Sequence, residues 1–222
     1  MAATAGTART AVQTRPATTG IRTSSGTSTG TSSTRRSRVT GRRCRRSQRP
    51  TPERIALFRG VLASNAKDPL KSYDLVWLLH LVGDVHQPLH CATRVSSGGP
   101  DGDDGGNTVK LNCTGCPAKL HTFWDDVPGS AKTVKAALNP VISAAKKVPT
   151  PDPTLAAKTD EKVWIAESFN DAQTVAYQPP IMAGNGPFSL TTTYKDQAHT
   201  LAQRRVALAG ARLANLLNSE LK

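Results

Sequence analysis

The first fifty residues of this 222-residue chain lack whole classes of side chain. Residues 1–50 contain no Lys, Asp or Glu, and they also contain no Leu, Phe, Trp or Tyr. Such a segment cannot bury enough apolar surface to offset the entropy that is lost when it becomes ordered. We therefore expect residues 1–50 to be disordered or out of frame, and we place the folded domain at residues 51–222.

Three interpretations of residues 1–50 remain open. The first is a disordered basic arm that binds phosphate groups, since the segment contains eleven arginines. The second is a transit peptide, which is typically rich in Arg and Ser and poor in acids. The third, which we favour, is that the segment is not the natural N-terminus, because Lys goes from absent to twelve copies where foldable sequence begins.

The positive charge of the chain is concentrated in that segment. The formal net charge is +13, but after residue 50 there are 18 Lys and Arg against 16 Asp and Glu, a balance of +2. The basicity therefore belongs to the segment and not to the fold, so the charge of the fold alone does not indicate nucleic-acid binding.

Long apolar runs and repeated cysteine motifs are also missing. No run of 18 apolar residues occurs, so we expect no membrane-spanning helix, and no secretory signal is visible. Cys113 and Cys116 form one CxxC, and no second CxxC exists to complete a four-thiolate zinc site. A local disulfide and two free thiols both remain open for this pair.

Apolar residues recur at helical spacing after residue 51, which predicts a mostly α, single-domain fold. The expected helices cover 52–66, 70–87, 117–126, 160–177 and 194–221. Pro88 is expected to end or kink the second of them. The Gly- and Asp-rich residues 96–107 are expected to form a loop, followed by a strand-like run at Thr108–Leu111. We expect Trp77 and Trp124 to lie in the core rather than to stack on bases.

Two His/Asp pairs with the same spacing indicate a metal site. His80 and Asp84 are four residues apart in one predicted helix and so project from the same face. His121 and Asp125 repeat this spacing in another, and His90 follows the turn after the first pair. Nitrogen and oxygen ligands in this mixture suit zinc. Each pair alone is also compatible with a structural hydrogen bond, and the whole set is harder to explain in that way, although spacing alone leaves both interpretations open.

The motifs around these residues resemble a known family. In chain order they are GDVHQPLH at 83–90, DDGGN at 103–107 and LHTFWDD at 120–126, with Trp164, Glu167, Ser168 and LAGARLANLLN at 208–218 farther on. Over residues 53–222 the chain resembles the S1/P1 nuclease family. The members of this family are zinc-dependent nucleases that are specific for single-stranded nucleic acid. The resemblance implies a helical fold, of a kind shared with zinc phospholipase C, and three zinc ions at the base of a cleft.

The resemblance also implies a role for each candidate ligand. His80 and Asp84 would bind one zinc, and Asp84 would be the catalytic residue that bridges to a second zinc beside a metal-bound hydroxide. His90, His121 and Asp125 would hold the remaining zinc. The implied substrates are single-stranded DNA, RNA and the 3′-phosphates of nucleotides, with 5′-nucleotides as products. A monomeric, secreted or periplasmic protein is implied as well.

Four further residues lie in or beside these motifs. We expect His86 and Gln87 to fix neighbouring ligands rather than to bind metal themselves. Asn107 and Asp126 are candidates for contacting the phosphate of a substrate. Hydrogen bonds within the loop and at the helix end are the alternative for both of them.

The chain also departs from the family pattern. The family takes four more ligands from upstream, namely an N-terminal Trp, two His and an Asp, whereas this chain has no His before His80 and no Trp before Trp77. We therefore expect the chain to bind about one zinc ion and to cleave nucleic acid poorly. Two other hypotheses stay open: an inactive relic that binds nucleic acid through the Arg-rich arm, and a zinc phospholipase C-like enzyme.

Overall fold

The structure is a computed structural model that describes residues 38–40, 52–95, 101–129 and 138–221. Chain contacts separate Met1–Thr34 from Arg35–Lys222. The first of these units lies wholly outside the described residues. All the described helices and strands belong to the second unit.

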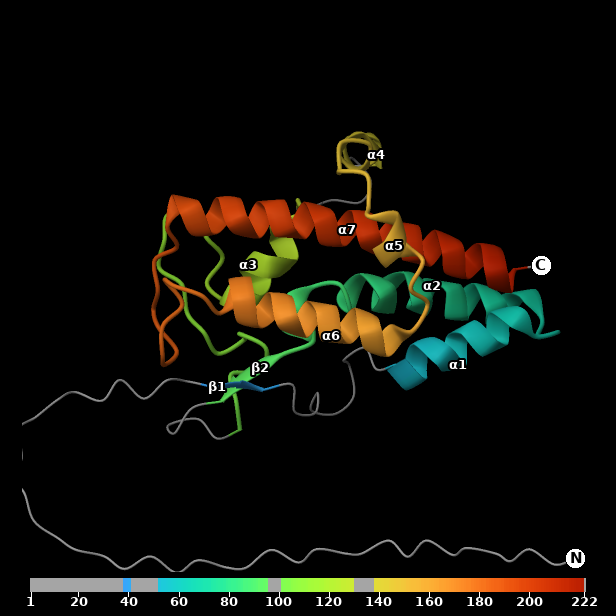
Figure 1. Ribbon diagram of the computed structural model, residues 1–222, viewed down its shortest axis with the longest axis horizontal. Helices are drawn as coiled ribbons and strands as arrows, with labels where there is room; N and C mark the ends of the chain where they lie inside the picture. The colour runs from blue at the N-terminus through green and yellow to red at the C-terminus, as the bar shows by residue number, and fades with distance from the viewer. Residues whose placement is uncertain (1–37, 41–51, 96–100, 130–137, 222) are drawn as a thin grey trace, which may run out of the picture. The chain divides into compact units, whose positions relative to one another are not determined.

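Helices dominate the described residues (Figure 1). In chain order the elements are β1 (Arg38–Thr40), α1 (Pro52–Ala63), α2 (Asp68–Asp84), η1 (Pro88–His90), β2 (Thr93–Val95), α3 (Leu120–Asp126), α4 (Leu138–Ala145), α5 (Pro153–Ala156), α6 (Glu161–Asp171), η2 (Ala172–Ala176) and α7 (Thr192–Glu220). The long helix α7 packs against α1, α2, α5 and η2, so it ties the other elements together. This confirms the mostly α fold class.

Three of the predicted helices are shorter than expected, and the first of them, α1, ends at Ala63 rather than at residue 66. Helix α2 ends at Asp84 rather than at residue 87, because a residue before proline is held extended and Gln87 has φ −88° and ψ 120°. Helix α3 begins at Leu120 rather than at residue 117, because Lys119 pairs with Lys110 in an isolated antiparallel bridge. Lys110 belongs to the strand-like run expected at Thr108–Leu111. Leu111 of the same run forms a second isolated bridge, with Phe188.

The helix expected at 160–177 changes character before its end. It is α-helical as α6 and then continues as the π-helical turn η2, in which the Tyr177 amide donates to the Ala172 carbonyl at 2.9 Å. Such turns add one residue to a helical turn and re-aim the side chains that follow. Here the turn delivers the Tyr177 hydroxyl to Asp103, at 2.9 Å.

Two buried clusters form the core, and the segment after α2 contributes to both. One cluster gathers residues of α3, η2 and the start of α7, including Trp124 and Tyr194. The other gathers residues of α1, α2, α6 and the end of α7, including Trp164. Val85 belongs to the second cluster and Leu89 to the first. The turn that carries His86, Gln87 and His90 is therefore anchored on both sides.

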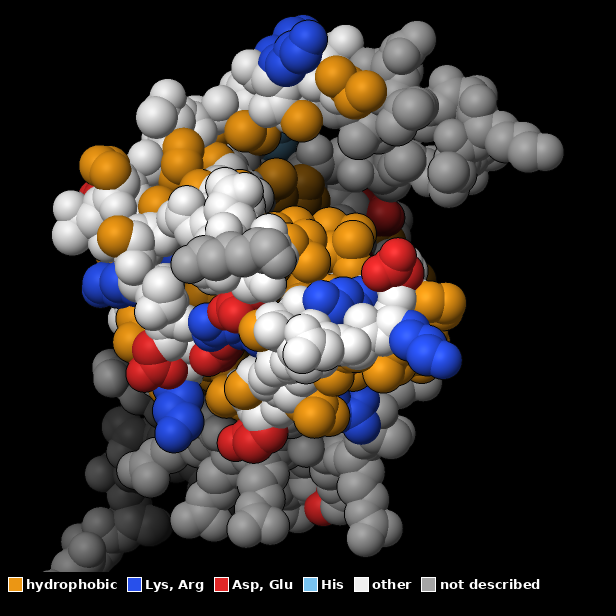
Figure 2. All heavy atoms as spheres, turned by 90° about the vertical axis from the view of Figure 1, so that its right-hand side faces the viewer, with side chains coloured by type: hydrophobic (Ala, Val, Ile, Leu, Met, Phe, Trp, Pro, Cys, Tyr) orange, Lys and Arg blue, Asp and Glu red, His pale blue; other side chains and the backbone are white. Residues whose placement is uncertain are grey.

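The two tryptophans expected in the core have different fates. Trp124 is 1% exposed and its indole NH donates to the Tyr194 hydroxyl at 3.1 Å, as expected. Trp77 is 38% exposed on α2, where it stacks on Phe58, so its assignment to the core was wrong. The apolar pattern of α2 extends around most of the helix, and part of it faces outward. Apolar side chains also gather on the end of the molecule that Figure 2 shows, among scattered charges.

Three residues of the segment 1–50 form the strand β1. It pairs antiparallel with β2, with Val39 opposite Arg94. The rest of residues 1–50 lies outside the described residues, so their disorder or misplacement stays a prediction. In the described part of the chain, no helix combines the length and apolar character needed to cross a membrane. Cys113 and Cys116 are joined by a disulfide, and Cys91 is buried, with its thiol directed to the Val85 carbonyl at 3.5 Å.

Candidate metal centre

His90, His121 and Asp125 converge on one point. Each offers a ligand atom, and these atoms all lie within 4.8 Å of one another. His90 Nε2 lies 3.4 Å from Asp125 Oδ1, and His121 Nε2 lies 3.6 Å from Asp125 Oδ2. Two imidazole nitrogens and one carboxylate oxygen fit the donor set of a catalytic zinc site, in which three protein ligands leave a position open. The residues that the sequence assigns to one zinc are therefore together.

Local structure explains how two distant segments meet here. His121 and Asp125 are one turn apart on α3, while His90 ends the 3-10 turn η1. Gln87 connects the two segments, because its Oε1 accepts from the Leu89 amide at 2.5 Å and its Nε2 donates to Asp125 Oδ1 at 2.7 Å. One side chain thus caps the turn that carries His90 and orients Asp125.

A backbone carbonyl fixes the orientation of His121. Its Nδ1 donates to the Gly105 carbonyl at 2.8 Å, and its Nε2 is directed toward Asp125, 3.6 Å away; in the neutral ring of this tautomer, Nε2 carries the lone pair. The His121 amide also donates to the Gly106 carbonyl, at 3.3 Å. Metal-binding histidines commonly hold their second nitrogen in this way. The loop 101–107 is therefore part of the centre even though it supplies no ligand to the cluster.

Asp103 holds that loop in place through hydrogen bonds to buried groups around it. It is 3% exposed, and its Oδ1 accepts from the amides of Arg94 and Gly106 at 3.0 and 3.1 Å and from the Tyr177 hydroxyl at 2.9 Å. Its Oδ2 forms an ion pair with Arg94 Nε at 3.4 Å. The sequence motifs did not single out Asp103 as a functional residue. Its place at the start of DDGGN, three residues before Gly106, was the available signal, since Asp side chains close turns with nearby amides.

Asp84 lies between two histidines. Its Oδ2 is 3.2 Å from His80 Nε2 and 3.7 Å from His90 Nδ1. Burial raises the pKa of Asp84, and the nearby His90 and His80 offset part of this rise. The His80 side chain is 58% exposed. Among the described residues, His90, His121 and Asp125 form the single group of three potential ligands, so His80 and Asp84 are brought close to it without completing a second group.

The charge of Asp125 is favoured where it stands. Burial alone would raise the pKa of Asp125. Hydrogen bonds from His90 and Gln87 and the nearby His121 lower it by more than burial raises it, so the net pKa lies below the ordinary value. A carboxylate must be ionised to bind metal. The surroundings of Asp125 therefore hold it in the form that a cation requires.

His86 is buried and fully engaged. Its Nδ1 donates to the Val82 carbonyl at 2.7 Å, and its Nε2 accepts from Arg212 at 3.0 Å. Burial lowers the pKa of His86 to about 3, and the positive charges of Arg205 and Arg212 add to this. Both ring nitrogens are used within the protein, so neither is available as a ligand.

The two candidate phosphate contacts lie at the edges of the site. The Asn107 side chain donates to the Asp104 carbonyl at 3.0 Å, which is the loop hydrogen bond expected for its alternative role. Asp126 is exposed at the end of α3, where its carbonyl accepts from the Gly129 amide at 2.9 Å. Their part in substrate binding stays a prediction.

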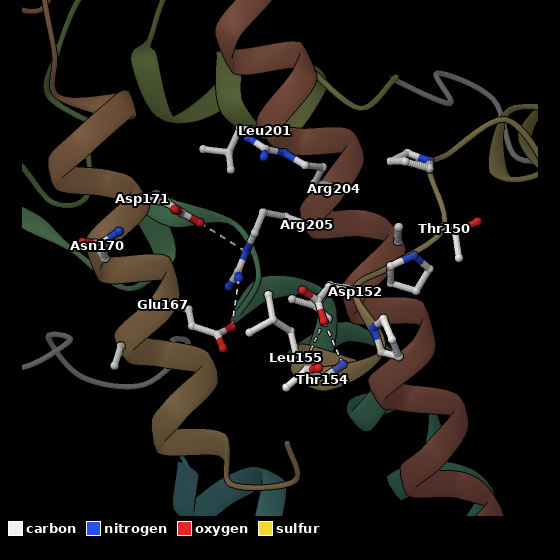
Figure 3. Close-up of a pocket in the computed structure, with 16 residues that line it drawn as sticks. Thr150, Asp152, Thr154, Leu155, Glu167, Asn170, Asp171, Leu201, Arg204 and Arg205 are labelled. Carbon is white, nitrogen blue, oxygen red and sulfur yellow. Dashed lines mark hydrogen bonds and ion pairs between the residues drawn. The ribbon is translucent and has the colours of Figure 1, made fainter. Parts of the chain in front are cut away.

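A large cavity lies away from this cluster. It measures about 1000 Å³ and is lined by α6, α7 and the segment before α5, and Glu167, Asp171 and Arg205 face it (Figure 3). A smaller cavity of about 150 Å³ is lined by Gln87, His86 and Trp124, among others. Since the large cavity contains none of His90, His121 and Asp125, cavity size does not mark the metal centre.

Comparison with known proteins agrees with this geometry. The model of the S1/P1 nuclease family matches residues 33–222. The chain therefore belongs to the S1/P1 nuclease family. It is 28% identical to Endonuclease 2 of Arabidopsis thaliana over 156 residues, which are 65% of this chain and 50% of that protein.

Two further relatives match over shorter stretches. Endonuclease 4 of Arabidopsis thaliana is 35% identical over 69 residues, which are 29% of this chain and 21% of that protein. Endonuclease 3 is 42% identical over 53 residues, 24% of this chain and 16% of that protein. The chain thus spans about half, or less, of the length of the relatives it matches.

Proposed function

We propose that residues 51–222 are the metal-binding part of a zinc-dependent nuclease that hydrolyses phosphodiester bonds of single-stranded DNA and RNA to 5′-nucleotides. The same centre would act on the 3′-phosphates of nucleotides. The observation that carries this proposal is the convergence of His90, His121 and Asp125 within 4.8 Å in a member of a nuclease family.

The proposed ligands fall into two groups. His90, His121 and Asp125 hold one zinc, while His80 and Asp84 are part of a site that needs further ligands. A bound zinc lowers the pKa of a coordinated water and offsets charge on the phosphate. Asp84 is placed to be shared between the groups, because its Oδ2 faces both His80 and His90. We expect about one zinc to be held firmly per chain.

The remaining residues position the ligands and the substrate. Gln87 orients Asp125 through its 2.7 Å hydrogen bond, and Gly105 orients His121. Asn107 keeps a second amide hydrogen for a phosphate oxygen, since an Asn side chain has two. Asp126 lies beside the ligand Asp125 on the exposed end of α3. We propose both as substrate contacts.

Location and assembly follow from the same proposal. A disulfide such as Cys113–Cys116 persists in oxidising compartments. This supports a secreted or periplasmic protein, which we propose together with a monomeric state.

The test is to measure zinc content and cleavage in the same preparation. The purified chain is expected to retain about one zinc after gel filtration and to cut single-stranded DNA weakly, with loss of both after chelation. Asp125→Asn should lose the zinc and the cleavage, whereas Asp196→Asn, an exposed position on α7, should keep them.

Three outcomes would contradict parts of the proposal. Three firmly bound zinc ions with strong cleavage would refute the expectation of one complete site. Hydrolysis of phosphatidylcholine without cleavage of DNA would favour the phospholipase C-like hypothesis. Salt-sensitive DNA binding that disappears when residues 1–50 are removed, with no chelator-sensitive hydrolysis, would favour the inactive relic.

A further inference from the structure

The turn after α2 joins two candidate ligands and is held from behind. It runs from Asp84 to His90, and its backbone carbonyls are held by two other helices. The Val85 carbonyl accepts from the Ser168 hydroxyl of α6 at 2.5 Å. The His86 carbonyl accepts from Arg205 Nε of α7 at 3.3 Å. The position of this turn therefore depends on polar groups that do not reach the metal centre.

Two arginines of α7 supply most of that support. Arg205 and Arg212 are seven residues apart and so lie on one face of the helix. They are 6% and 1% exposed. Arg212 donates to His86 Nε2 at 3.0 Å, while the other nitrogen of that ring donates to Val82 of α2 at 2.7 Å. The His86 ring is thus fixed between α2 and α7.

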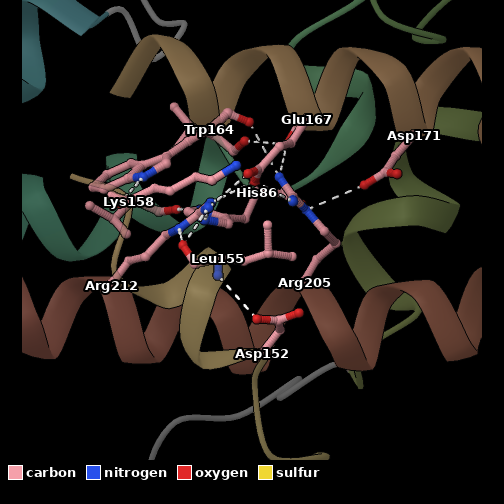
Figure 4. Close-up of polar contacts among 12 residues, drawn as sticks. His86, Asp152, Leu155, Lys158, Trp164, Glu167, Asp171, Arg205 and Arg212 are labelled. Atoms are coloured by element: carbon pink, nitrogen blue, oxygen red, sulfur yellow. Dashed lines mark hydrogen bonds and ion pairs between the residues drawn. The ribbon is translucent and has the colours of Figure 1, made fainter. Parts of the chain in front are cut away.

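Glu167 of α6 orients both arginines. Its two oxygens accept from two nitrogens of Arg212 at 2.8 and 2.9 Å, and Oε2 also accepts from Arg205 at 3.1 Å (Figure 4). A fork-to-fork contact of this kind fixes geometry as well as charge. Asp171 lies 3.5 Å from Arg205 Nε, and among the described residues it forms no ion pair with Arg212.

Stability alone is a weak reason for such an arrangement. Removing charges from water is costly, and apolar residues of similar volume often serve a core as well or better. Besides the carboxylates, these two arginines donate hydrogen bonds to three kinds of acceptor: backbone carbonyl groups, the Ser168 hydroxyl and the ring of His86. His86 directly precedes Gln87, whose side chain holds Asp125 at 2.7 Å.

We propose that Glu167 is a positioning residue for the metal centre, acting through Arg212 and His86 on Gln87 and so on Asp125. This inference rests on the proposed zinc site and adds to it a supporting residue on α6. Glu167 keeps 20% of its side chain exposed and borders the large cavity, so a substitution there is less disruptive than one at Arg212.

The test is to titrate the metal-free full chain with Co²⁺ and to measure binding through the visible absorption of the bound ion. Glu167→Gln is expected to raise the Kd for Co²⁺ by about 10–100-fold, the range typical of lost support to a metal ligand. Glu53→Gln, which removes one exposed carboxylate from α1, should leave the Kd unchanged. Gln87→Ala should weaken binding like Glu167→Gln without touching the ion pairs.

The double variant separates positioning from a general structural role. If Glu167 acts through Gln87, combining Glu167→Gln with Gln87→Ala weakens Co²⁺ binding no more than the stronger single change. If the two losses multiply, or if either single variant binds Co²⁺ like the wild type, the proposal is overturned. Should Glu167→Gln fail to fold by circular dichroism, Glu167→Asp replaces it in the cycle, because the shorter side chain keeps the charge but cannot make the same two-atom contact with Arg212.

A failure of the proposed function gives a different result. If the wild-type chain binds no Co²⁺ at all, the metal centre itself is wrong. If the wild type binds Co²⁺ and Glu167→Gln binds it equally well, the centre stands and the positioning role falls.

Discussion

At the scale of single residues, the ionisation of Glu167 depends on two opposing effects, its burial and its contacts with Arg212 and Arg205. Burial would raise its pKa, but hydrogen bonds and charge from Arg212 and Arg205 outweigh this, so its pKa lies below the ordinary 4.5. The neighbouring Asp171 is shifted the other way, because burial raises its pKa and Arg205 offsets only part of the rise. The two carboxylates therefore respond differently to acid.

Glu167 should make the stability of the fold depend on pH. Because its pKa is lower in the folded chain than in the unfolded one, its contribution is complete above about pH 4.5 and is lost as the pH falls through the folded value. The free energy of unfolding of Glu167→Gln should therefore lie below that of the wild type at pH 7 by more than it does at pH 3. Urea unfolding of the metal-free proteins at both values checks this. An equal difference at both pH values would show that Glu167 is not ionised in the way described.

The convergence of His90, His121 and Asp125 and a supporting role for Gln87 could be predicted from the sequence, but the hydrogen bonds that provide the support could not. The i, i+4 spacing of His121 and Asp125 places both on one face of a helix, and the structure brings His90 to them as expected. The contact of Gln87 with Asp125 joins residues 38 positions apart. The role of Asp103 depends on a hydroxyl 74 positions away. No local spacing reveals such long-range hydrogen bonds.

At the scale of elements, the loop 101–107 must approach α3 closely. Gly106 has a φ of +83°, and a Cβ added to it would lie 3.1 Å from Leu89 Cδ1 and 3.4 Å from the His121 amide nitrogen. Gly115 has a similar φ of +73°, but a Cβ there would meet nothing within 4 Å. The two glycines share the backbone conformation and differ in crowding.

Alanine at these two positions should therefore have unequal effects. Gly115→Ala is expected to lower the free energy of unfolding by about 1 kcal/mol, the usual effect of a side chain in this backbone region. Gly106→Ala should lower it by about 1–3 kcal/mol more, because the added methyl also overpacks the contact with Leu89. It should weaken Co²⁺ binding as well, since the Gly106 carbonyl holds His121. Equal effects of the two variants on stability and metal affinity would refute this account of the loop.

The positions of the helices were easier to predict than their ends. The apolar periodicity of α7 was sufficient to place it, because that pattern belongs to the helix itself. The start of α3 depends on the bridge between Lys110 and Lys119, and the change from α6 to η2 depends on where Tyr177 must point. Both are set by distant residues, so local patterns misplaced them.

At the scale of the whole molecule, the described residues contain one group of three potential metal ligands, and His80 and Asp84 lie beside it without completing a second group. The chain spans about half of Endonuclease 2 of Arabidopsis thaliana. His80 is exposed, and the neighbouring outer face of α2 carries the exposed apolar side chains of Tyr73, Val76 and Trp77. A helical pattern that is apolar on most sides does not reveal which side is covered. The exposure of Trp77 therefore could not be predicted from the sequence.

The central claim is that His90, His121 and Asp125 together hold zinc. X-ray absorption at the zinc edge of the full chain, loaded with one equivalent of zinc, tests it most directly. We predict a first shell of nitrogen and oxygen at roughly 2.0–2.1 Å with the outer-shell signature of two imidazole rings. His121→Ala should retain little zinc after gel filtration, and any zinc that remains should show the signature of one ring only. A sulfur shell at about 2.3 Å, or imidazole scattering that His121→Ala leaves unchanged, would contradict the account.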